Sequence, residues 1–426
     1  MIAQTQTLNQ LRPDTRVVAA AFAAVVLFGV AWSLLHVGFY RRDQVIDTPI
    51  YQRYGNAITD GKVPYRDFAV EYPPGALFAF TIPGFAEPGP PNEVTTGFRH
   101  AFETLMWLCG AAVVLASALT LFSLRAERAH VWAALAFIAI APLAIGSVIL
   151  SRFDLWPTAL VAAAIAALVT GRWRLGCGIL GFAVATKFFP AVLVPPAVIY
   201  VWRRGGRREA LVCAAVCVGV AAAVFAPFLA LAPSGVWHSV TGQLTRPLQL
   251  ESLGSAVLIA AHHVGGLHIR METGSGSQNL AGSLPDAIAA IESALLAVSL
   301  LVVWVVFARG PATRGRLIRF SAASLAFFVA FGKVLSPQFM IWLVPVVPLV
   351  RGRRGVSASV LLGLALVLTQ LWFPFRYWRL AEEFDPAASW LLLARDLILV
   401  ALAFLLTLPD KRGDARELVA DVPGPA

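Results

Sequence analysis

Among the carboxylates that follow the first long apolar run of the chain, 17–37, three are candidates for a chemical role. They are Asp43, Asp47 and Glu71. A carboxylate at the point where chain, membrane and water meet is placed to take a proton from a hydroxyl group, as a general base does. Asp47 also precedes Thr-Pro, a position where an aspartate often caps a helix. The spacing alone leaves both interpretations of Asp47 open.

The residues after Asp47 predict a short helix over about 49–60. Pro49 suits the first turn of a helix, and Gly61 suits its end. One face of this helix would be apolar and suited to lying on the membrane surface. The residues of that face are Tyr51, Tyr54 and Ile58.

The rest of this loop carries further polar and aromatic residues. Tyr65 precedes Glu71 and Tyr72, and two prolines then prevent a helix. The apolar piece 76–85 is too short to cross a bilayer, so we expect it to lie along the interface. The loop is therefore predicted to be a shaped structure pressed onto the lipid, with several carboxylates above it.

The elements that must hold these carboxylates are strongly apolar. Of the 426 residues, 58% are hydrophobic and only 14% are charged, with a mean hydropathy of +0.73. A soluble domain is about a quarter charged, so the composition indicates a polytopic membrane protein. The net charge of +10 lies largely in short loops between apolar runs. We therefore expect membrane lipids, and no nucleic acid, among its partners.

Nine apolar runs come close to the roughly 20 residues that a membrane span needs. They are 17–37, 98–123, 131–149, 155–171, 209–232, 286–308, 316–334, 355–373 and 389–409. Three shorter runs remain: 175–187, 189–202 and 338–350. We predict an all-α integral membrane protein, a multi-pass helical bundle of about twelve membrane segments, with interfacial helices in the first outer loop.

The short runs 175–187 and 189–202 meet at Pro190 and allow two topologies. The chain either turns near Lys187 and returns, or crosses once as a kinked span. Two passes place 19 of the 34 basic residues and 7 of the 24 acidic residues on one face. The positive-inside rule assigns that face to the cytoplasm. We therefore predict two passes and cytoplasmic termini.

This topology divides the chain into three parts. Residues 1–16 form a cytoplasmic tail, 17–409 form the membrane domain, and 410–426 form a second cytoplasmic tail that is expected to be disordered. The long outer loops are 38–97 and 233–285. Because the unusual polar residues lie on the outer side, we expect the working site of a cell-membrane protein on its outer, periplasmic face.

Cations end several short outer connections. Arg152, Lys187 and Lys333 each lie beside a membrane segment, where charge is costly and tends to serve function. Arginine forks and lysine point charges both hold phosphate groups, so the three are predicted to bind an anionic head group. The alternative for each of these three cations is a purely structural salt bridge, such as one between Arg152 and Asp154.

Further candidate contacts for a donor or an acceptor are spread over the outer segments. They are Tyr51, Tyr65, Tyr72, Asp154, Arg246, Glu251, His262, Gln338 and Arg376. His262 and His263 are adjacent and have no acidic partner at ligand spacing, so no metal is expected. The four cysteines lie in apolar runs and indicate buried packing. The Gly-Ser stretch 274–277 is predicted to be a flexible linker.

Several motifs together resemble glycosyltransferase family 87, whose members belong to the C-type superfamily of polyprenyl-phosphate-sugar-dependent membrane enzymes. The first loop supplies "DTPIYQRYGNAITDGKVPY" and "EYPPGAL". The motifs "SRFDLWPTAL", "GFAVATKFFPAVLVPP" and "GKVLSPQFMIWLVP" follow in the same order. The resemblance covers about 40–350 and implies a helical bundle with an outer-face site. It also implies that Asp47 is the catalytic carboxylate.

The expected reaction is an inverting single displacement. A hydroxyl of an envelope glycolipid or polysaccharide would attack the sugar of a polyprenyl-phosphate donor, with mannose and arabinofuranose both open. Asp47 would be the general base, with Asp43 and Glu71 as the other candidates. No cofactor or metal is expected. A lipid or sugar transporter or flippase is the main alternative, but it would show inverted repeats and mid-membrane charges. A noncatalytic envelope scaffold is a third possibility and leaves the acidic loop without a purpose.

Overall fold

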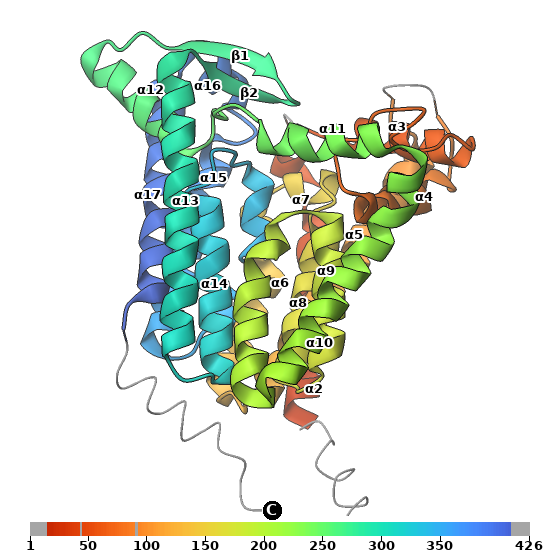
Figure 1. Cartoon of the computed structure of the whole chain (residues 1–426). Helices are drawn as coiled ribbons and strands as arrows, with labels where there is room; N and C mark the ends of the chain where they lie inside the picture. The colour runs from red at the N-terminus through yellow and green to blue at the C-terminus, as the bar shows by residue number, and fades with distance from the viewer. Residues whose placement is uncertain (1–14, 43–44, 90–92, 410–426) are drawn as a thin grey trace, which may run out of the picture.

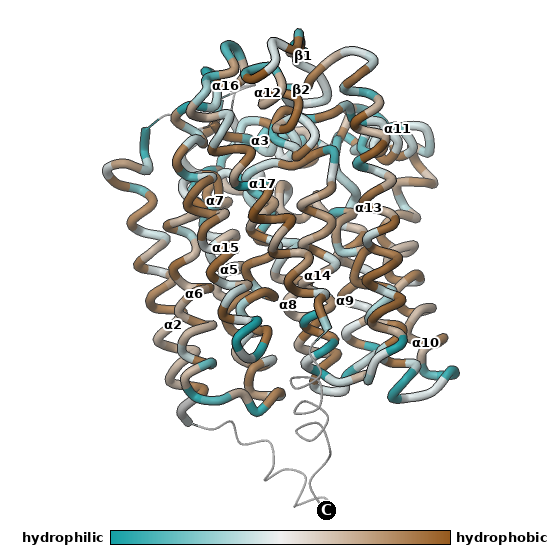
Figure 2. Tube along the Cα trace, turned by 90° about the vertical axis from the view of Figure 1, so that its left-hand side faces the viewer, coloured by the Kyte–Doolittle hydropathy of each residue, from teal (hydrophilic) through white to brown (hydrophobic). Residues whose placement is uncertain are grey.

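The computed structural model describes residues 15–42, 45–89 and 93–409 as a bundle of helices that run between two ends (Figure 1). The predicted tails 1–16 and 410–426 lie almost wholly outside these residues, and so does Asp43. Figure 2 shows that apolar residues dominate the middle of the bundle and that polar residues gather at both ends. This distribution is that of a membrane protein.

Within the described residues, seven helices are long and apolar enough to cross a membrane. They are α2 (Thr15–Leu34), α5 (Thr96–Ser123), α6 (Arg128–Ile145), α10 (Val194–Leu231) with the preceding 3-10 turn η3 (Phe189–Leu193), α13 (Ser283–Arg309), α15 (Gly352–Trp372) and α17 (Pro386–Thr407). The predicted number of about twelve membrane segments is not confirmed and stays a prediction.

Three shorter helices complete the bundle. They are α8 (Leu155–Val169), α9 (Trp173–Thr186) and α14 (Arg314–Ala330). α8 packs between α5 and α9, and α14 packs against α13 and α17. Most side chains of α8 and α14 are buried, because longer helices surround them. The runs 155–171 and 316–334 are therefore helical, as predicted, but shorter than expected.

The chain turns back after Lys187. α9 ends just before this lysine, η3 crosses over, and α10 returns as far as Gly206. Gly206 breaks the helix with a φ of 84°, a region that glycine enters readily. Arg174 at the start of α9 pairs with Glu209 just beyond this break at 2.8 Å. This is the geometry of two passes and not of one kinked span.

The basic loops meet at the same end of the bundle. The guanidinium of Arg314 donates to the carbonyl of Ser123 at 3.1 Å, and that of Arg354 donates to the carbonyl of Pro409 at 3.2 Å. These contacts join loops that are far apart in the sequence. Since basic loops favour the cytoplasm, we expect this end to face inward.

Cysteine labelling tests this topology. We expect Lys62→Cys to react with an impermeant maleimide added outside intact cells, and Arg207→Cys to react only after the membrane is opened. Both native side chains are exposed, whereas the native cysteines within the described residues are buried. Outside labelling at position 207 would contradict the two-pass geometry.

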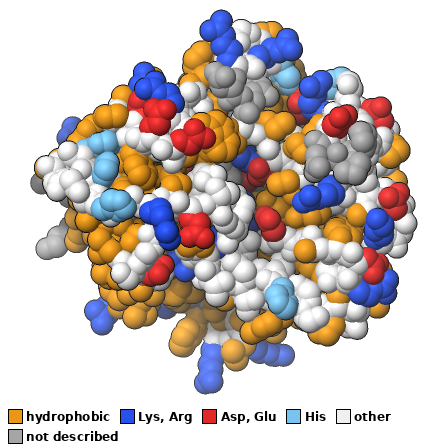
Figure 3. Space-filling view, turned by 90° about the horizontal axis from the view of Figure 1, so that it is seen from above, with side chains coloured by type: hydrophobic (Ala, Val, Ile, Leu, Met, Phe, Trp, Pro, Cys, Tyr) orange, Lys and Arg blue, Asp and Glu red, His pale blue; other side chains and the backbone are white. Residues whose placement is uncertain are grey.

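The opposite end, which we expect to face outward and call the outer end, is built from short elements. They are η1 (Gly38–Arg41), α3 (Thr48–Thr59), η2 (Pro74–Ala76), α4 (Leu77–Gly84), α7 (Val148–Ser151), α11 (Pro233–Leu244), α12 (Leu253–Gly265), β1 (Arg270–Gly274), β2 (Ser277–Ala281) and α16 (Tyr377–Glu383). Figure 3 looks down on this end, where acidic and basic side chains are interspersed with apolar ones.

The strands β1 and β2 correct two predictions. They pair antiparallel, so the fold is not all-α. Ser275 and Gly276 form the turn between them with φ values of 52° and 67°, as a two-residue hairpin turn with two positive φ angles requires. The prediction of a flexible linker over 274–277 is wrong, because the same small residues suit a tight turn between pairing strands.

The helix α3 agrees with the predicted range 49–60, but its apolar face does not lie on the membrane. Tyr51 and Tyr54 are buried against the protein, because α4 folds back over them. The two helices cross so closely that a Cβ at Gly55 would lie 2.6 Å from the carbonyl oxygen of Phe80. The side chains that α4 leaves exposed are those of Phe78 and Ile82. A membrane-surface position for α4 stays a prediction.

The apolar run 338–350 is not an α-helix. It forms two 3-10 turns, η4 (Pro337–Trp342) and η5 (Val347–Leu349), and most of its residues are buried. Prolines remove backbone donors throughout this run. Such a backbone is tolerated at membrane depth only where protein surrounds it.

Candidate active site

Asp47 begins α3 but does not cap it through its side chain. Its φ and ψ of −105° and −5° differ from the extended backbone typical of a capping residue. The carboxylate instead forms an ion pair with the guanidinium of Arg152. The hydroxyl of Tyr51 lies 3.4 Å from the same carboxylate oxygen. A simple capping role therefore does not account for Asp47.

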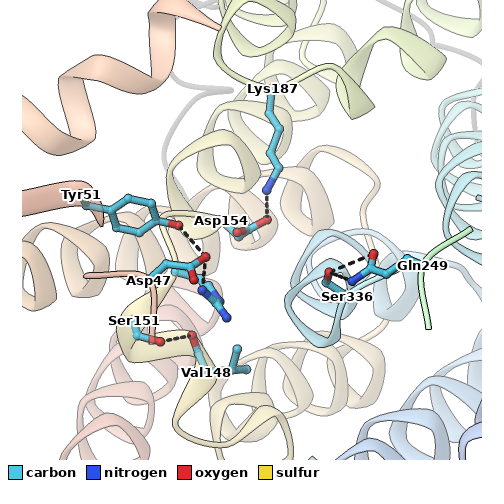
Figure 4. A network of polar contacts seen from close by, with 9 residues as sticks. Asp47, Tyr51, Val148, Ser151, Asp154, Lys187, Gln249 and Ser336 are labelled. Atoms are coloured by element: carbon cyan, nitrogen blue, oxygen red, sulfur yellow. Dashed lines mark hydrogen bonds and ion pairs between the residues drawn. The ribbon is translucent and has the colours of Figure 1, made fainter. Parts of the chain in front are cut away.

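A second ion pair lies beside the first (Figure 4). The ammonium of Lys187 is 2.7 Å from Oδ1 of Asp154, and the indole N–H of Trp342 donates to the same oxygen at 2.7 Å. Asp154 begins α8 and Lys187 directly follows α9, so the turn after α9 positions the pair. The salt bridge between Arg152 and Asp154, given above as the structural alternative, does not form; Arg152 pairs with Asp47 and Lys187 with Asp154 instead.

Aromatic rings surround the ammonium of Lys187. It lies 4.8 Å from the ring centre of Phe153, 5.4 Å from that of Phe339 and 5.1 Å from that of Trp342. Ring faces attract a cation while they exclude water. Burial lowers the pKa of Lys187, although the neighbouring Asp154 acts in the opposite direction.

The Arg152 side chain is further removed from water. The residue is 6% exposed, and burial lowers its pKa to about 10. Its Nε is buried and has no hydrogen-bond partner among the described residues. A desolvated guanidinium with a free donor is suited to an incoming anion, because charge-assisted hydrogen bonds are strong where water is excluded.

Glu251 lies on the far side of this cluster. Its carboxylate contacts the amide of Gln249, which also donates to the hydroxyl of Ser336 at 2.9 Å. Burial raises the pKa of Glu251 to about 7, while nearby arginines oppose the rise. Its burial therefore favours the uncharged form of this carboxyl group.

Aromatic side chains of the first outer loop pack against the ion pairs. The ring of Tyr51 is 6.0 Å from that of Tyr72 and 5.7 Å from that of Phe153. The hydroxyl of Tyr65 donates to the carbonyl of Tyr72 at 2.6 Å. The Glu71 side chain is exposed at the edge of this group. Tyr51 and Tyr72 therefore border the Asp47 site, whereas the Glu71 side chain is exposed and has no contact with Asp47 among the described residues.

Other predicted site residues are engaged elsewhere. The ammonium of Lys333 donates to the carbonyl of Leu244 at 3.0 Å. Nδ1 of His262 lies 2.7 Å from the carbonyl of Leu267 at the end of α12, on the opposite side of the outer end from α3 (Figure 1).

Two arginines and one amide complete the list of predicted contacts. Arg376 pairs with Asp385 at 3.8 Å. Arg246 donates to the hydroxyl of Ser277 at 2.9 Å, so it ties the hairpin to the outer end. Gln338 is partly buried, and its Oε1 has no hydrogen-bond partner among the described residues.

Arg152 therefore pairs with Asp47 and Lys187 with the adjacent Asp154. Arg246 lies close enough to act on Lys187 and Glu251 through its charge, and its Nε is buried without a hydrogen-bond partner among the described residues.

The comparison with protein families bears on this arrangement. The sequence model of glycosyltransferase family 87 matches residues 70–337, more than half of the chain. The chain belongs to glycosyltransferase family 87. The match includes Arg152, Asp154 and Lys187, but it begins after Asp47, so the role of Asp47 rests on geometry. Family membership supports a membrane glycosyltransferase.

No curated protein matches the chain. Among solved structures, the chain is similar to an oligosaccharyltransferase from Archaeoglobus fulgidus that is tethered to an acceptor peptide by a disulfide bond, with 15% identity and a TM-score of 0.44. The alignment covers 95% of this family 87 chain and 56% of the archaeal chain, so this chain spans little more than half of that protein's length.

The sequence analysis missed a buried charged cluster behind the family 87 site. Arg395 and Asp396 in α17 form an ion pair at 2.7 Å, and both are fully buried. Arg395 also donates to the carbonyl of Glu251 at 2.9 Å. The carboxylate of Glu292 in α13 accepts from the amide of Gly254 at 2.6 Å. These contacts hold the start of α12 and Glu251 in place. Charges inside apolar runs were the signal that could have found them.

We expect Arg395→Met to destabilise the protein by about 3–5 kcal/mol, because it leaves the Asp396 carboxylate buried without its counter-ion. The double variant Arg395→Met with Asp396→Leu should lose much less, since neither charge remains. Thermal unfolding in detergent measures both. Equal losses in the single and double variants would contradict a role for the pair as mutual counter-ions.

Proposed function

We propose that the protein transfers a sugar from a polyprenyl-phosphate-sugar to a hydroxyl of an envelope glycolipid or polysaccharide, on the outer face of the membrane. Mannose and arabinofuranose are the sugars we favour. The observation that carries the proposal is the contact between Asp47 and the buried guanidinium of Arg152, with Lys187 in the adjacent pair. A base suits the acceptor hydroxyl in a glycosyl transfer, and two cations that are largely shielded from water suit the departing phosphate.

The proposed step is a single displacement. The carboxylate of Asp47 accepts the proton of the acceptor hydroxyl as its oxygen attacks the anomeric carbon. The bond from that carbon to the phosphate oxygen breaks, and polyprenyl phosphate leaves with the bonding electrons. The configuration at the anomeric carbon is inverted. Arg152 and Lys187 stabilise the charge on the departing phosphate.

The ion pair between Asp47 and Arg152 imposes an order on these events. A carboxylate bound to a guanidinium is a weak base, because the cation stabilises its charged form. A donor phosphate that binds Arg152 would take over this counter-ion and leave Asp47 free to accept a proton. Donor binding would therefore activate the base, and the unpartnered Nε of Arg152 offers the phosphate a first contact.

Metal-independent catalysis is part of the proposal. Within the described residues, no group of three or more His, Cys, Asp or Glu side chains is placed to hold a metal ion. The buried Arg152 and the partly buried Lys187 can carry the charge on a lipid monophosphate by themselves. We expect activity to survive treatment with EDTA.

A flippase is the second candidate. The buried pair of Arg395 and Asp396 and the nearby Glu292 place charge inside membrane helices, as a transporter would require. Arg395 and Asp396 bind each other, and Arg395 and Glu292 bind the backbone at Glu251 and at the start of α12. The charged cluster is therefore explained by a structural role, because it holds the segment that carries Glu251 in place beside the outer site.

The decisive experiment is incubation of the purified protein with radiolabelled polyprenyl-phosphate sugars and candidate acceptors. We expect label to move to the acceptor without nucleotide sugar and to keep moving after EDTA. Movement of intact labelled lipid across proteoliposomes, without any transfer, would support the flippase instead. Loss of activity on chelation that Mg²⁺ or Mn²⁺ restores would contradict metal-independent catalysis.

A further inference from the structure

The two oxygens of the Asp47 carboxylate have different surroundings. The guanidinium of Arg152 and the hydroxyl of Tyr51 both contact Oδ2, the hydroxyl at 3.4 Å (Figure 4). Oδ1 has no hydrogen bond or ion pair among the described residues. Because the side chain of Asp47 is 26% exposed, Oδ1 is the oxygen left for the hydroxyl of an acceptor.

The ring of Tyr51 is fixed from several sides. The residue is 1% exposed, and its ring stacks on that of Phe80 with the centres 4.6 Å apart. The rings of Phe102 and Phe153 lie 5.5 Å and 5.7 Å away. A ring packed this closely cannot swing aside, so its hydroxyl is held beside Asp47.

The hydroxyl of Tyr51 has one proton to donate. The hydroxyl of Tyr72 and the backbone of Phe153 also hydrogen-bond to it. The carboxylate of Asp47 is the strongest acceptor among these neighbours, because hydrogen bonds to a charged group are the stronger ones. Burial raises the pKa of Tyr51 well above its usual value. The hydroxyl therefore keeps its proton and remains a donor to Oδ2.

We propose that Tyr51 is the positioning residue of the base: its hydroxyl holds Oδ2 of Asp47, so that Oδ1 accepts the proton of the acceptor hydroxyl. The inference rests on the proposed function, since it concerns the same base. The contact matters most after the donor phosphate has taken Arg152 from Asp47, because Tyr51 is then the described residue that still holds Oδ2. This role differs from the direct contact with a donor or acceptor that the sequence predicts for Tyr51.

The step remains the single displacement described above. The proton passes from the acceptor hydroxyl to Oδ1 while the acceptor oxygen forms the bond to the anomeric carbon. Polyprenyl phosphate leaves with the electrons of the broken bond. Oδ2 keeps its hydrogen bond from Tyr51 throughout, since the uncharged oxygen of a protonated carboxyl group is still an acceptor.

The variant Tyr51→Phe tests this role because it keeps the ring and removes only the oxygen. We expect kcat to fall about 10-fold, the effect of losing one hydrogen bond to a charged group, with both KM values unchanged. The acid limb of the kcat profile should move to higher pH. A carboxylate that has lost a hydrogen-bond donor binds a proton more readily, so a higher pH is needed to free the base. The other polar groups around the base remain in the variant, namely Arg152, Asp154, Lys187, Tyr72 and Glu251.

Tyr54→Phe is the matched control. Tyr54 lies in the same helix, is 3% exposed and also packs on the ring of Phe80, but its hydroxyl contacts the backbone of Glu71. Its kcat and acid limb should match those of the unmodified protein. A normal kcat and an unmoved acid limb in Tyr51→Phe would overturn the proposal, and so would equal changes in Tyr54→Phe.

A second background separates positioning from damage to the fold. In Asp47→Asn no base remains to be positioned, so adding Tyr51→Phe should not lower the residual transfer further. A further 10-fold loss there would overturn the proposal, because Tyr51 would then act on the fold and not on the base.

An infrared titration of the donor-free protein tests the contact without catalysis. The protonated-carboxyl band that is missing in Asp47→Asn identifies Asp47. We expect Tyr51→Phe to move the midpoint of this band to higher pH and Tyr54→Phe to leave it in place; an unmoved midpoint in Tyr51→Phe would overturn the contact. If no sugar is transferred from any donor but the midpoint moves, the proposed function fails and the bond between Tyr51 and Asp47 stands. If transfer proceeds with full kcat in Tyr51→Phe, this inference alone fails.

Discussion

Asp47→Asn should lower turnover by at least about two orders of magnitude, because the amide cannot accept a proton from the acceptor hydroxyl. The substitution keeps the size of the side chain and its place at the start of α3. It also removes the charge that Arg152 binds in the donor-free protein. Donor binding should therefore persist or improve while transfer is lost.

Matched carboxylates isolate this effect. Asp60→Asn, at the other end of α3, should leave turnover almost unchanged, and Asp43→Asn should cost much less than Asp47→Asn. Glu71→Gln should likewise have little effect, since the Glu71 side chain is exposed and does not contact the two ion pairs. Near-normal turnover of Asp47→Asn beside a folded but inactive Asp43→Asn or Glu71→Gln would move the base to another carboxylate. Normal turnover in all three would remove the first-loop carboxylates from the mechanism.

The sequence predicts those parts of the structure that local chemistry controls. Pro49 and Gly61 bracket α3 to within one residue at each end, because proline suits the first helical turn and glycine the end of a helix. The turn after Lys187 followed from the distribution of basic residues, since loops on the cytoplasmic side of a membrane protein collect arginine and lysine.

The partners of the site residues could not be read in the same way. Asp47 and Arg152 meet only because α3, α7 and α8 come together at the outer end of the bundle. Pairing Arg152 with its neighbour Asp154 was the nearest choice in sequence. The turn after α9 instead brings Lys187 to Asp154, and Arg152 is then available to Asp47.

Local sequence patterns also gave wrong predictions where the same pattern is compatible with two different structures. An apolar helix face packs equally well on lipid and on another helix, so Tyr51 and Tyr54 gave no sign that α4 would cover them. A Gly-Ser stretch serves as a linker or as a hairpin turn, depending on whether its flanks pair, as β1 and β2 do. In both cases the decision comes from tertiary contacts.

Arg152→Ala should lower kcat/KM for the donor by about 10²–10³-fold, the usual effect of removing one preorganised group that stabilises transition-state charge. The acceptor KM should change little. Lys187→Ala should behave similarly, whereas Arg66→Ala, an exposed arginine paired with Asp67, should leave the kinetics unchanged. Arg152→Lys should recover only part of the loss, because a lysine keeps the charge but not the two-pronged fork that holds a phosphate.

The double variant Arg152→Ala with Asp47→Asn gives the sharpest test of the coupling between donor and base. In Arg152→Ala, Asp47 has lost its counter-ion and is a free base before the donor arrives. In Asp47→Asn, no base remains to be released. If the phosphate activates Asp47 by taking Arg152 from it, the two losses in kcat/KM will not add, because they interrupt one sequence of events. Strictly additive losses would mean that Arg152 and Asp47 act independently. Unchanged donor kinetics in both Arg152→Ala and Lys187→Ala would mean that the phosphate binds elsewhere.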